Sequence, residues 1–270
     1  MAQVSASGPP AEVLAPLRAD PARSAVLTDI DGTLAPIVER PEQAAVPADA
    51  SALLAELSGR FGIVGCVSGR RAEEARDLVG VDGIAYAGNH GLELLLPGDS
   101  EPRLDPSLEG REDAAGTYLG QLDGEALTAG GLRVEDKGPI QALHWRGAED
   151  EQAAAARARE IAAEAGKLGL EPRWGRKVLE LRPAGGGGKD AAVGALIGSG
   201  DVAAAIYGGD DRTDLDAFAR LRGLRDEGRL EAAVCVGVVS DEAPAELEDE
   251  SDLTVEGPPG WLALLRVLAG

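Results

Sequence analysis

Short apolar runs alternate with helical segments near the start of the chain, and this alternation most constrains the fold. The runs are Ser24–Thr28, Ile63–Val67 and Ile84–Ala87, and residues at helical spacing occupy Ala48–Arg60 and Arg71–Leu78 between them. Continuous apolar runs of this length are typical of strands that are buried on both faces of a parallel sheet. Because helices must connect such strands, the pattern predicts right-handed βαβ units in a doubly wound, Rossmann-like α/β domain.

The pattern changes in the middle of the chain. The polar stretch Pro97–Pro106 is expected to be a linker, and the residues after it to form helix, two strands, helix and two strands. These elements are the helices Leu108–Leu127 and Glu149–Leu168 and the strands Leu132–Glu135, Ile140–Trp145, Glu171–Trp174 and Lys177–Arg182. Two similar halves of this kind predict a small α+β domain.

The glycine-rich stretch Ala184–Lys189 then leads back to the first pattern. The elements expected after it are the helices Lys189–Ile197, Asp214–Leu221 and Gly260–Leu268 and the strands Ala203–Tyr207, Ala233–Val238 and Leu253–Val255. We therefore expect a core formed by residues 1–97 and 184–270, with the α+β domain of residues 98–183 inserted into it. Two hinges would let the inserted domain open and close over a site.

Charge and hydropathy exclude several classes of partner. The chain has 26 Lys and Arg against 47 Asp and Glu, a formal net charge of −21, and such a surface repels nucleic-acid phosphates. No window approaches the roughly 18 consecutive apolar residues of a membrane span, and the start lacks the features of a signal peptide. We expect a cytoplasmic protein without nucleic-acid or membrane partners. Cys66 and Cys235 lie in apolar runs and are expected to be buried free thiols.

Two carboxylates lie just past the end of the first buried strand, in Leu27-Thr28-Asp29-Ile30-Asp31-Gly32-Thr33-Leu34. Open α/β sheets bind their ligands at the carboxyl ends of the strands. A simple Asp-Gly turn would explain Asp31 and Gly32 but not Asp29 at the strand end. The motif therefore indicates a site with two acidic groups.

Polar groups follow other expected strands as well. Ser68-Gly69-Arg70 follows the second strand, and Asp210, Asp211 and Asp214 follow the strand Ala203–Tyr207. Lys189 opens a helix after four glycines, but GxxxxGK[ST] is not matched and Asp190 comes next. A nucleotide-binding P-loop is therefore not expected.

The DxDGTL motif resembles the first motif of the haloacid dehalogenase superfamily of phosphotransferases. The resemblance implies that Asp29 is the nucleophile that becomes an aspartyl-phosphate, and that Asp31 protonates the leaving alcohol and then deprotonates water. It also implies that Ser68 binds a phosphate oxygen and that Lys189 neutralises phosphate charge. The second Asp favours ester hydrolysis or mutase chemistry over ATP hydrolysis.

The same resemblance implies a magnesium site. Asp29, the main-chain carbonyl of Asp31, and Asp210 would hold Mg²⁺, which prefers a few carboxylates and waters. Asp211 and Asp214 are expected to orient these ligands. Capping of the following helix is the alternative for Asp214, and both roles are compatible.

Further segments resemble the trehalose-6-phosphate phosphatases, over about residues 24–268. They are Gly88–Glu93, Glu135-Asp136-Lys137-Gly138, His144-Trp145-Arg146, Lys177–Pro183 and the sequence GDDRTDLDAF that begins at Gly209. Ile30, Trp145 and the glycines before Lys189 depart mildly from that family's pattern.

This resemblance implies which residues bind the substrate. Glu135, Lys137 and Glu180 of the inserted domain would hold the sugar hydroxyls. The remaining expected substrate-binding residues belong to the core: Gly69, Arg70, Asn89 and His90. A surface ion pair between Glu135 and Lys137 is the alternative for those two residues, and packing against the hairpin is the alternative for His144.

The expected function is Mg²⁺-dependent hydrolysis of trehalose 6-phosphate to trehalose and phosphate, coupled to a trehalose-6-phosphate synthase. A phosphatase for another sugar phosphate, such as a glucosylglycerol, sucrose or mannosyl-glycerate ester, would use the same core. A non-catalytic module that binds sugar phosphate and regulates a synthase is the third interpretation. The filled catalytic positions disfavour it, because proteins that have lost activity usually lack the nucleophile or the acid.

Overall fold

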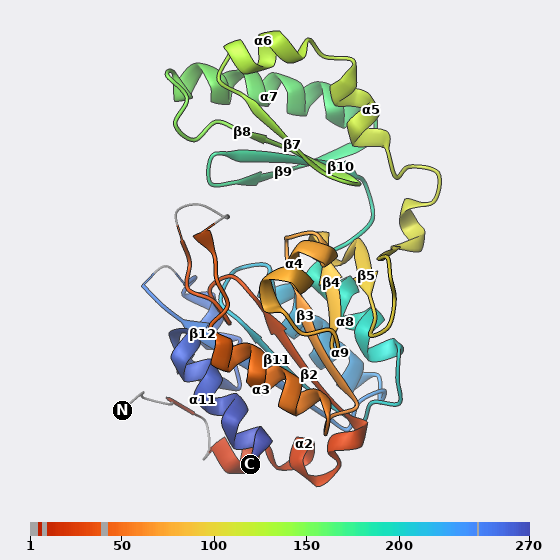
Figure 1. The fold of residues 1–270 in the computed structure, drawn as a ribbon, viewed down its shortest axis with the longest axis vertical. Coiled ribbons are helices and arrows are strands. Elements are labelled where there is room, and N and C mark those ends of the chain that lie inside the picture. Colours follow the sequence, from red (N-terminus) through yellow and green to blue (C-terminus); the bar gives the residue numbers. More distant parts are fainter. Residues whose placement is uncertain (1–4, 7–9, 39–42, 242) are drawn as a thin grey trace. The chain divides into compact units, whose positions relative to one another are not determined.

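The computed structural model describes residues 5–6, 10–38, 43–241 and 243–270, and the chain forms two compact units (Figure 1). The larger unit contains Met1–Arg103 and Gly187–Gly270, and the smaller unit contains Leu104–Gly186. The smaller unit is therefore inserted, in sequence, between the two parts of the larger one.

The larger unit is built on a nine-stranded sheet with the order β1-β13-β12-β11-β2-β3-β4-β5-β6. The strands are β1 Ser5–Ala6, β2 Ser24–Asp29, β3 Ile63–Val67, β4 Ala85–Gly88, β5 Glu93–Leu95, β6 Arg103–Leu104, β11 Ala204–Gly209, β12 Ala232–Val239 and β13 Leu253–Glu256. The central strands from β13 to β4 are parallel, whereas β1 and β5 pair antiparallel with their neighbours. The predicted parallel α/β fold class is confirmed.

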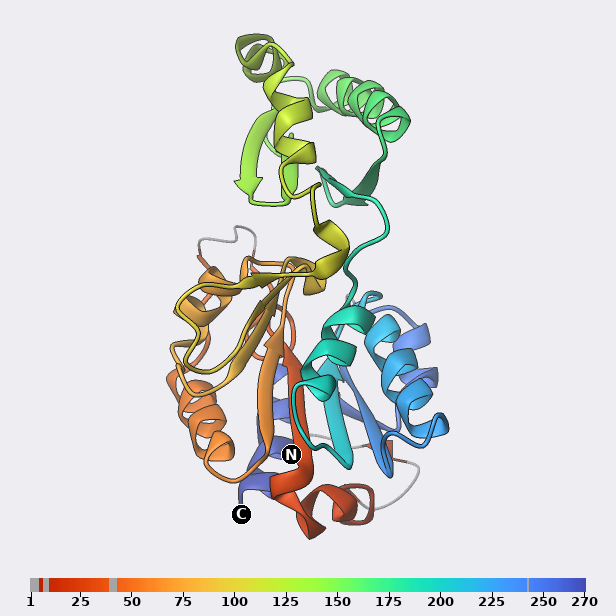
Figure 2. The same ribbon diagram turned by 90° about the vertical axis from the view of Figure 1, so that its right-hand side faces the viewer.

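Helices cover both faces of this sheet (Figure 2). One face carries α2 Ala15–Ala19, α3 Ala48–Ser58, α4 Ala72–Val79 and α11 Gly257–Ala269, and the other carries α8 Lys189–Gly198 and α9 Asp214–Asp226. Successive strand residues point to opposite faces: Val26 packs in the core under α3 and α11, whereas Ala25 and Leu27 pack under α8 and α9. Both sides of the strands are buried, which explains their continuous apolar runs. Two short helices complete this unit, α1 Pro10–Val13 and α10 Glu246–Asp249.

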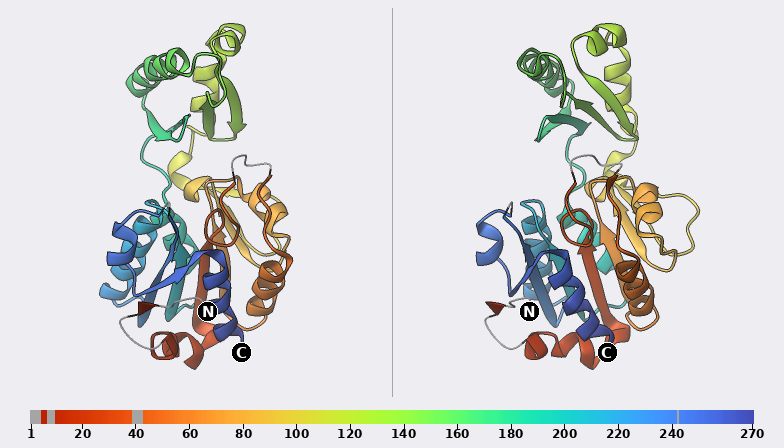
Figure 3. Two further views of the ribbon diagram at one scale, coloured as in Figure 1. Left: turned by 90° about the vertical axis from the view of Figure 1, so that its left-hand side faces the viewer. Right: turned by 60° about the vertical axis from the view of Figure 1, so that its left-hand side comes forward.

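The smaller unit is an antiparallel sheet with the order β7-β8-β10-β9, with helices against one face (Figure 3). Its elements are α5 Ala114–Gly120, α6 Gly124–Ala129, β7 Arg133–Lys137, β8 Ile140–His144, α7 Glu151–Lys167, β9 Leu170–Gly175 and β10 Val178–Pro183. Leu143, Leu179 and Leu181 join the helices in one apolar core. Alternate residues of the same strands therefore face away from the helices.

The structure corrects three details of the sequence interpretation. The single helix expected over Leu108–Leu127 is wrong, because Asp123 accepts hydrogen bonds from the backbone N–H groups of Glu125 and Ala126 and thereby begins a second helix, α6. Part of the expected linker Pro97–Pro106 forms β6, and β5 was not predicted because three residues carry little periodic signal. Cys66 and Cys235 are free and buried, as predicted.

Within the described residues, none of the helices combines the length and the apolar character needed to cross a membrane.

Candidate active site

The end of β2 places Asp29 at the carboxyl edge of the sheet. Every residue of β2 is buried, and Thr28 accepts a hydrogen bond from the Trp261 indole nitrogen at 2.9 Å. Beyond Asp29 the chain turns sharply, because the backbone N–H groups of Leu34 and Ala35 both donate to the carbonyl of Ile30. Asp29 is therefore held on a rigid strand end rather than on a mobile loop.

Gly32 allows this turn to lie directly against Asp210. Its φ is +98°, and a Cβ atom at this position would lie 2.0 Å from Oδ2 of Asp210. Thr33 donates its hydroxyl to Oδ1 of the same aspartate at 3.0 Å. The turn after β2 thus positions the carboxylate that follows β11, since β2 and β11 are neighbouring parallel strands.

Lys189, the first residue of α8, contacts both the end of β2 and the first residue of α9. Its Nζ atom lies 2.9 Å from Oδ1 of Asp29 and 2.6 Å from Oδ1 of Asp214, and the side chain is almost fully buried. Although burial opposes its charge, the carboxylates of Asp214 and Asp29 raise the pKa of Lys189 well above its usual value. Lys189 therefore carries a fixed positive charge beside Asp29.

Asp214 is saturated with hydrogen bonds. It accepts from Nζ of Lys189, the Tyr207 hydroxyl and the backbone N–H groups of Asp210 and Asp211, at 2.6 to 2.9 Å. These four donors use the acceptor capacity of the carboxylate, so Asp214 orients its neighbours rather than binding a cation. Tyr207 was missed by the sequence interpretation, although a tyrosine in a buried strand needs a partner for its hydroxyl.

Asp211 has a related but more local role. Its Oδ1 accepts from the backbone N–H and the hydroxyl of Thr213, at 2.8 and 2.6 Å, and from the backbone N–H of Asp214 at 3.2 Å. It also lies 3.7 Å from Nζ of Lys189. Asp211 therefore stabilises the start of α9, and its role in orienting metal ligands stays a prediction.

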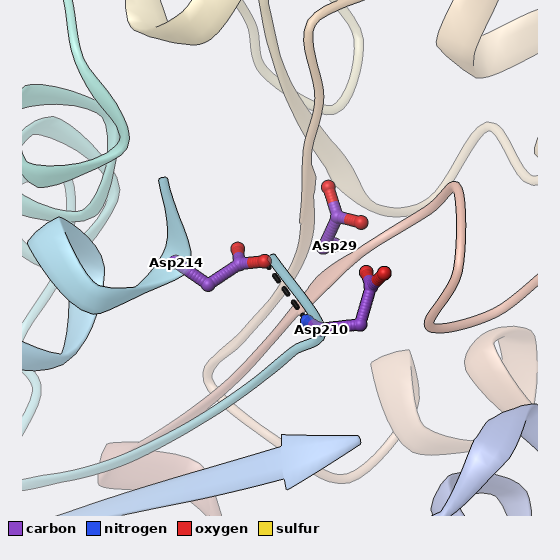
Figure 4. A group of neighbouring side chains, drawn as sticks. All are labelled: Asp29, Asp210 and Asp214. Carbon is purple, nitrogen blue, oxygen red and sulfur yellow. Dashed lines mark hydrogen bonds between the residues drawn. The ribbon is translucent and has the colours of Figure 1, made fainter. Parts of the chain in front are cut away.

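The site gathers more negative than positive charge. Oxygen atoms of Asp29, Asp210 and Asp214 lie within 4.8 Å of one another (Figure 4). Burial and the neighbouring carboxylates of Asp214 and Asp211 raise the pKa of Asp210 to about 7. Burial likewise raises the pKa of Asp29 well above its usual value, although Lys189 opposes this rise.

This donor set fits a hard divalent cation. Since Asp214 is saturated, Asp29 and Asp210 are the two side chains of the group that could hold the ion, together with the Asp31 carbonyl expected from the sequence. Carboxylate and carbonyl oxygens are the ligands that Mg²⁺ prefers, and it keeps waters in its remaining positions.

Asp31 lies in a more open environment than Asp29. Nε and Nη2 of Arg70 donate to its two carboxylate oxygens at 2.8 and 2.7 Å, and its side chain is 38% exposed. Ser68, which is almost fully buried, accepts from the backbone N–H of Arg70 at 3.2 Å. The loop after β3 thus lies beside the turn after β2.

Asn89 and His90 are both near this loop, but they play different roles. The Asn89 side chain is fully buried and donates to Glu93 at 2.9 Å, so it supports its surroundings, and its contact with the substrate stays a prediction. His90 is partly exposed, and its ring lies against Gly69, where a Cβ atom would be 2.7 Å from the ring. Asn89 and His90 both have positive φ, 49° and 54°. Asparagine tolerates this left-handed region, whereas for most other side chains it costs roughly 1–2 kcal/mol.

In the smaller unit, the three expected sugar-binding residues lie on the sheet face that the helices leave uncovered. Nζ of Lys137 lies 2.8 Å from Oε1 of Glu180, and Nε2 of His144 lies 2.6 Å from Oε2 of Glu135. Glu135 is thus paired with a residue of the adjacent strand β8, and Lys137 with a residue of β10, the next strand beyond it. His144 belongs to this charged group through Glu135, which sequence reasoning had left open.

Comparison with known proteins places the chain among related sequences and structures. The pattern of the trehalose-phosphatase family matches residues 27–251. The trehalose-phosphate phosphatase of Mycobacterium avium (strain 104) is 38% identical over 215 residues, which cover 74% of this chain and 51% of that protein. An uncharacterized glycosyl hydrolase of Mycobacterium tuberculosis (strain ATCC 25618 / H37Rv) is 36% identical over 211 residues, 74% of this chain and 15% of that protein.

A solved structure, the crystal structure of a trehalose-6-phosphate phosphatase related protein, is 25% identical with a TM-score of 0.67. The likeness covers 91% of this chain and 96% of that one. The chain spans about half the length, or less, of the two curated relatives described above. The matched residues 27–251 include Asp29, Asp31, Lys189 and Asp210, together with the whole smaller unit. The chain therefore belongs to the trehalose-phosphatase family.

Proposed function

We propose that this chain hydrolyses trehalose 6-phosphate to trehalose and phosphate through an aspartyl-phosphate on Asp29. The observation that carries the proposal is the contrast between two neighbouring carboxylates. Asp29 is buried against the cation of Lys189, whereas Asp31 is more exposed and paired with Arg70. Lys189 holds the Asp29 carboxylate in place for the attack, whereas the more exposed Asp31 can exchange protons with the leaving group and with water.

In the first step, an oxygen of Asp29 attacks phosphorus and the bond between phosphorus and the sugar oxygen breaks. When Arg70 leaves Asp31 to bind the phosphate, Asp31 can take up a proton. The leaving oxygen receives that proton, and Asp31 returns to a carboxylate. Lys189 holds Oδ1 of Asp29 at 2.9 Å, which fixes the orientation of the carboxylate before the attack.

In the second step, Asp31 accepts a proton from water while the water oxygen attacks phosphorus. The bond between phosphorus and Asp29 then breaks, which releases phosphate and restores both carboxyl groups. Ser68, Gly69, Arg70 and His90 are assigned to the non-bridging phosphate oxygens, and Lys189 neutralises their charge.

The proposal includes Mg²⁺, held by Asp29, Asp210 and the carbonyl of Asp31. When bound, the ion would neutralise charge on the phosphoryl oxygens and orient the phosphate. Asp214 and Thr33 support this arrangement because both hold Asp210, through its backbone N–H and its carboxylate.

The smaller unit is proposed to be the cap that selects the sugar. Glu135, Lys137 and Glu180 present charged hydrogen-bonding groups on one sheet face, and sugars rich in hydroxyls are recognised by such groups. A trehalose-6-phosphate synthase, which would supply the substrate, is the partner that this proposal implies.

Phosphate release from a panel of sugar phosphates tests the proposal. We expect trehalose 6-phosphate to be hydrolysed with the highest kcat/KM, EDTA to abolish the activity and added Mg²⁺ to restore it. A higher kcat/KM for another sugar phosphate would reassign the substrate. Binding of sugar phosphate without release from any ester would identify a regulatory module instead.

A further inference from the structure

Glu93 is a buried carboxylate that takes no part in the proposed chemistry. Its side chain is 2% exposed although it lies on the short strand β5. Oε2 accepts from the backbone N–H of Ala72 at 2.8 Å, and Oε1 accepts from Nδ2 of Asn89 at 2.9 Å. Nε of Arg71 lies 3.8 Å from Oε1. Burying a carboxylate costs free energy unless hydrogen bonds or opposite charges compensate for the lost solvation. The contacts of Glu93 therefore need an explanation.

The two donors belong to different parts of the fold. Ala72 is the first residue of α4, where an anion is favourable because the N–H groups of the first turn have no partner within the helix. Asn89 begins a turn in which Asn89, His90 and Gly91 have φ values of 49°, 54° and 91°. One carboxylate therefore links α4 to three successive residues in the left-handed region.

This turn, residues 89–91, contacts the loop after β3. The backbone N–H of Asn89 donates to the carbonyl of Arg70 at 2.7 Å, and that of His90 donates to the carbonyl of Ser68 at 2.9 Å. The His90 ring lies on Gly69. A shift of the turn would therefore move Ser68, Gly69 and Arg70, which the proposed function assigns to phosphate together with His90.

The turn also contacts the start of α8. The carbonyl of His90 accepts from the backbone N–H of Gly188 at 2.5 Å. A Cβ atom at Gly91 would lie 2.7 Å from the carbonyl oxygen of Gly188 and 2.9 Å from the backbone nitrogen of Ala192. The start of α8, and with it Lys189, therefore packs directly on the turn.

We propose that Glu93 is a positioning residue for phosphoryl transfer, which acts by holding the turn 89–91 against the phosphate-binding loop and the start of α8. The inference rests on the proposed function, since the groups it positions are those assigned to phosphate. Glu93 touches neither the substrate nor Asp29 in this arrangement. Its effect must therefore reach the reaction through Asn89 and the turn.

The variant Glu93→Gln tests this inference with little change in volume. Both partners of Glu93 are donors, so the amide group of glutamine must face one of them and one hydrogen bond is lost. We expect kcat to fall about 10- to 100-fold. The loss should be the same for trehalose 6-phosphate and for p-nitrophenyl phosphate, because the turn serves phosphate and not the sugar.

Asp252→Asn is the matched control. Asp252 also accepts a backbone N–H bond, from Cys235 at 2.7 Å, and also lies 3.8 Å from an arginine, Arg222. It contacts β12, which β11 separates from β2. This variant should lower the thermal midpoint of unfolding without changing kcat.

A second variant separates positioning from general destabilisation. In Glu93→Gln/Asn89→Asp the donor and acceptor between the two side chains are exchanged, and aspartate tolerates the left-handed region as asparagine does. We expect the double variant to recover most of the lost kcat, and Asn89→Asp alone to be at least as impaired as Glu93→Gln.

The third readout does not depend on activity. The chain has two histidines, His90 and His144, so the histidine ring signals in an NMR spectrum are few and can be assigned with His144→Gln. Glu93→Gln should shift the His90 signals and leave those of His144 in place. The double variant should return the His90 signals toward their original positions.

The outcomes separate this inference from the proposed function. A lower thermal midpoint with unchanged kcat and unmoved His90 signals would overturn the inference, as would a loss confined to trehalose 6-phosphate. If the unaltered protein hydrolyses no ester, the proposed function fails. The His90 signals then decide the inference. Signals that do not move in Glu93→Gln contradict it, and signals that move in Glu93→Gln and return in the double variant support it.

Discussion

Asp29 and Asp31 are separated by one residue, yet their surroundings differ in every respect that matters for phosphoryl transfer. Asp29 is 5% exposed and contacts a buried ammonium group. The Asp31 side chain is partly exposed to solvent, and both of its carboxylate oxygens accept hydrogen bonds from the guanidinium group of Arg70. The difference arises because β2 ends at Asp29, whereas Asp31 lies in the turn that follows, beyond the buried Ile30. Two carboxylates in unlike environments can perform unlike tasks.

Substitution of these two residues should separate chemistry from folding. Asp29→Asn removes the nucleophile and should abolish phosphate release, and Asp31→Asn should lower kcat by about 10²- to 10⁴-fold because the proton donor is lost. Both variants keep the side-chain volume, so their circular dichroism spectra should match that of the unaltered protein. Asp201→Asn, on the surface beside Arg23, is the control. Turnover at the original rate in Asp29→Asn would rule out the aspartyl-phosphate.

At the scale of elements, the site is assembled by three segments that follow β2, β3 and β11 and by the starts of α8 and α9. The pairing of Thr28 with Gly208 places the ends of β2 and β11 side by side. The first residue of α9, Asp214, then accepts the N–H groups of Asp210 and Asp211. Parallel strands bring their carboxyl ends to one edge, so residues distant in sequence meet there.

Gly32→Ala tests how closely the turn after β2 must approach Asp210. The added methyl would lie 2.0 Å from the carboxylate, at a φ of +98°. We expect Asp210 to be displaced and the Mg²⁺ concentration for half-maximal activity to rise about tenfold or more. The free energy of unfolding should also fall by roughly 1–2 kcal/mol from the backbone strain.

Gly98→Ala supplies the control for that strain. Gly98 has a φ of +89° and no heavy atom within 4 Å of the added Cβ. It should therefore lose stability like Gly32→Ala while its Mg²⁺ requirement stays unchanged. Equal Mg²⁺ requirements in the two variants would show that the close approach to Asp210 has no role.

At the scale of the whole molecule, the chain divides chemistry and sugar recognition between its two units in our proposal. The larger unit contains the proposed nucleophile, the proton donor and the metal ligands. The smaller unit has its own apolar core and places two hydrogen-bonded pairs, Lys137 with Glu180 and His144 with Glu135, on its uncovered sheet face. A small ester that lacks the sugar would need the larger unit alone.

Kinetics with two substrates, trehalose 6-phosphate and p-nitrophenyl phosphate, test this division. We expect a lower kcat/KM for trehalose 6-phosphate in each of three variants, Glu135→Ala, Lys137→Ala and Glu180→Ala. The loss should be roughly 30- to 1000-fold, or about 2–4 kcal/mol, because each substitution removes a charged hydrogen-bonding partner of the sugar. The same variants should barely change the slow cleavage of p-nitrophenyl phosphate. Glu164→Ala, on the exposed side of α7, should affect neither substrate.

Two other results would contradict this prediction. Equal losses on both substrates would indicate a defect in folding or in closure of the cap. The absence of any loss would identify the three residues as surface charges. Because Lys137 pairs with Glu180, the thermal midpoint of each variant must be measured alongside the kinetics.

By itself, the sequence determined the helices and strands whose apolar residues recur at a regular spacing. The strand Ile63–Val67 has the predicted bounds, and β2 is one residue longer than predicted. The cluster at the strand ends could also be anticipated, since parallel strands bring Asp29 and Asp210 to one edge, and the helix that begins at Lys189 starts at that edge. Periodicity and strand direction are local properties, and local properties can be read without a structure.

Only the tertiary structure decided which side chains meet. The contact between Lys189 and Asp29 spans 160 positions, and the burial of Asn89 depends on Glu93 in a strand too short to predict. The acceptor of the Tyr207 hydroxyl likewise depends on where α9 begins. A hydrogen bond requires its two atoms to lie within about 3 Å at a suitable angle. The packing of strands and helices from distant parts of the chain sets that distance, and no local pattern contains it.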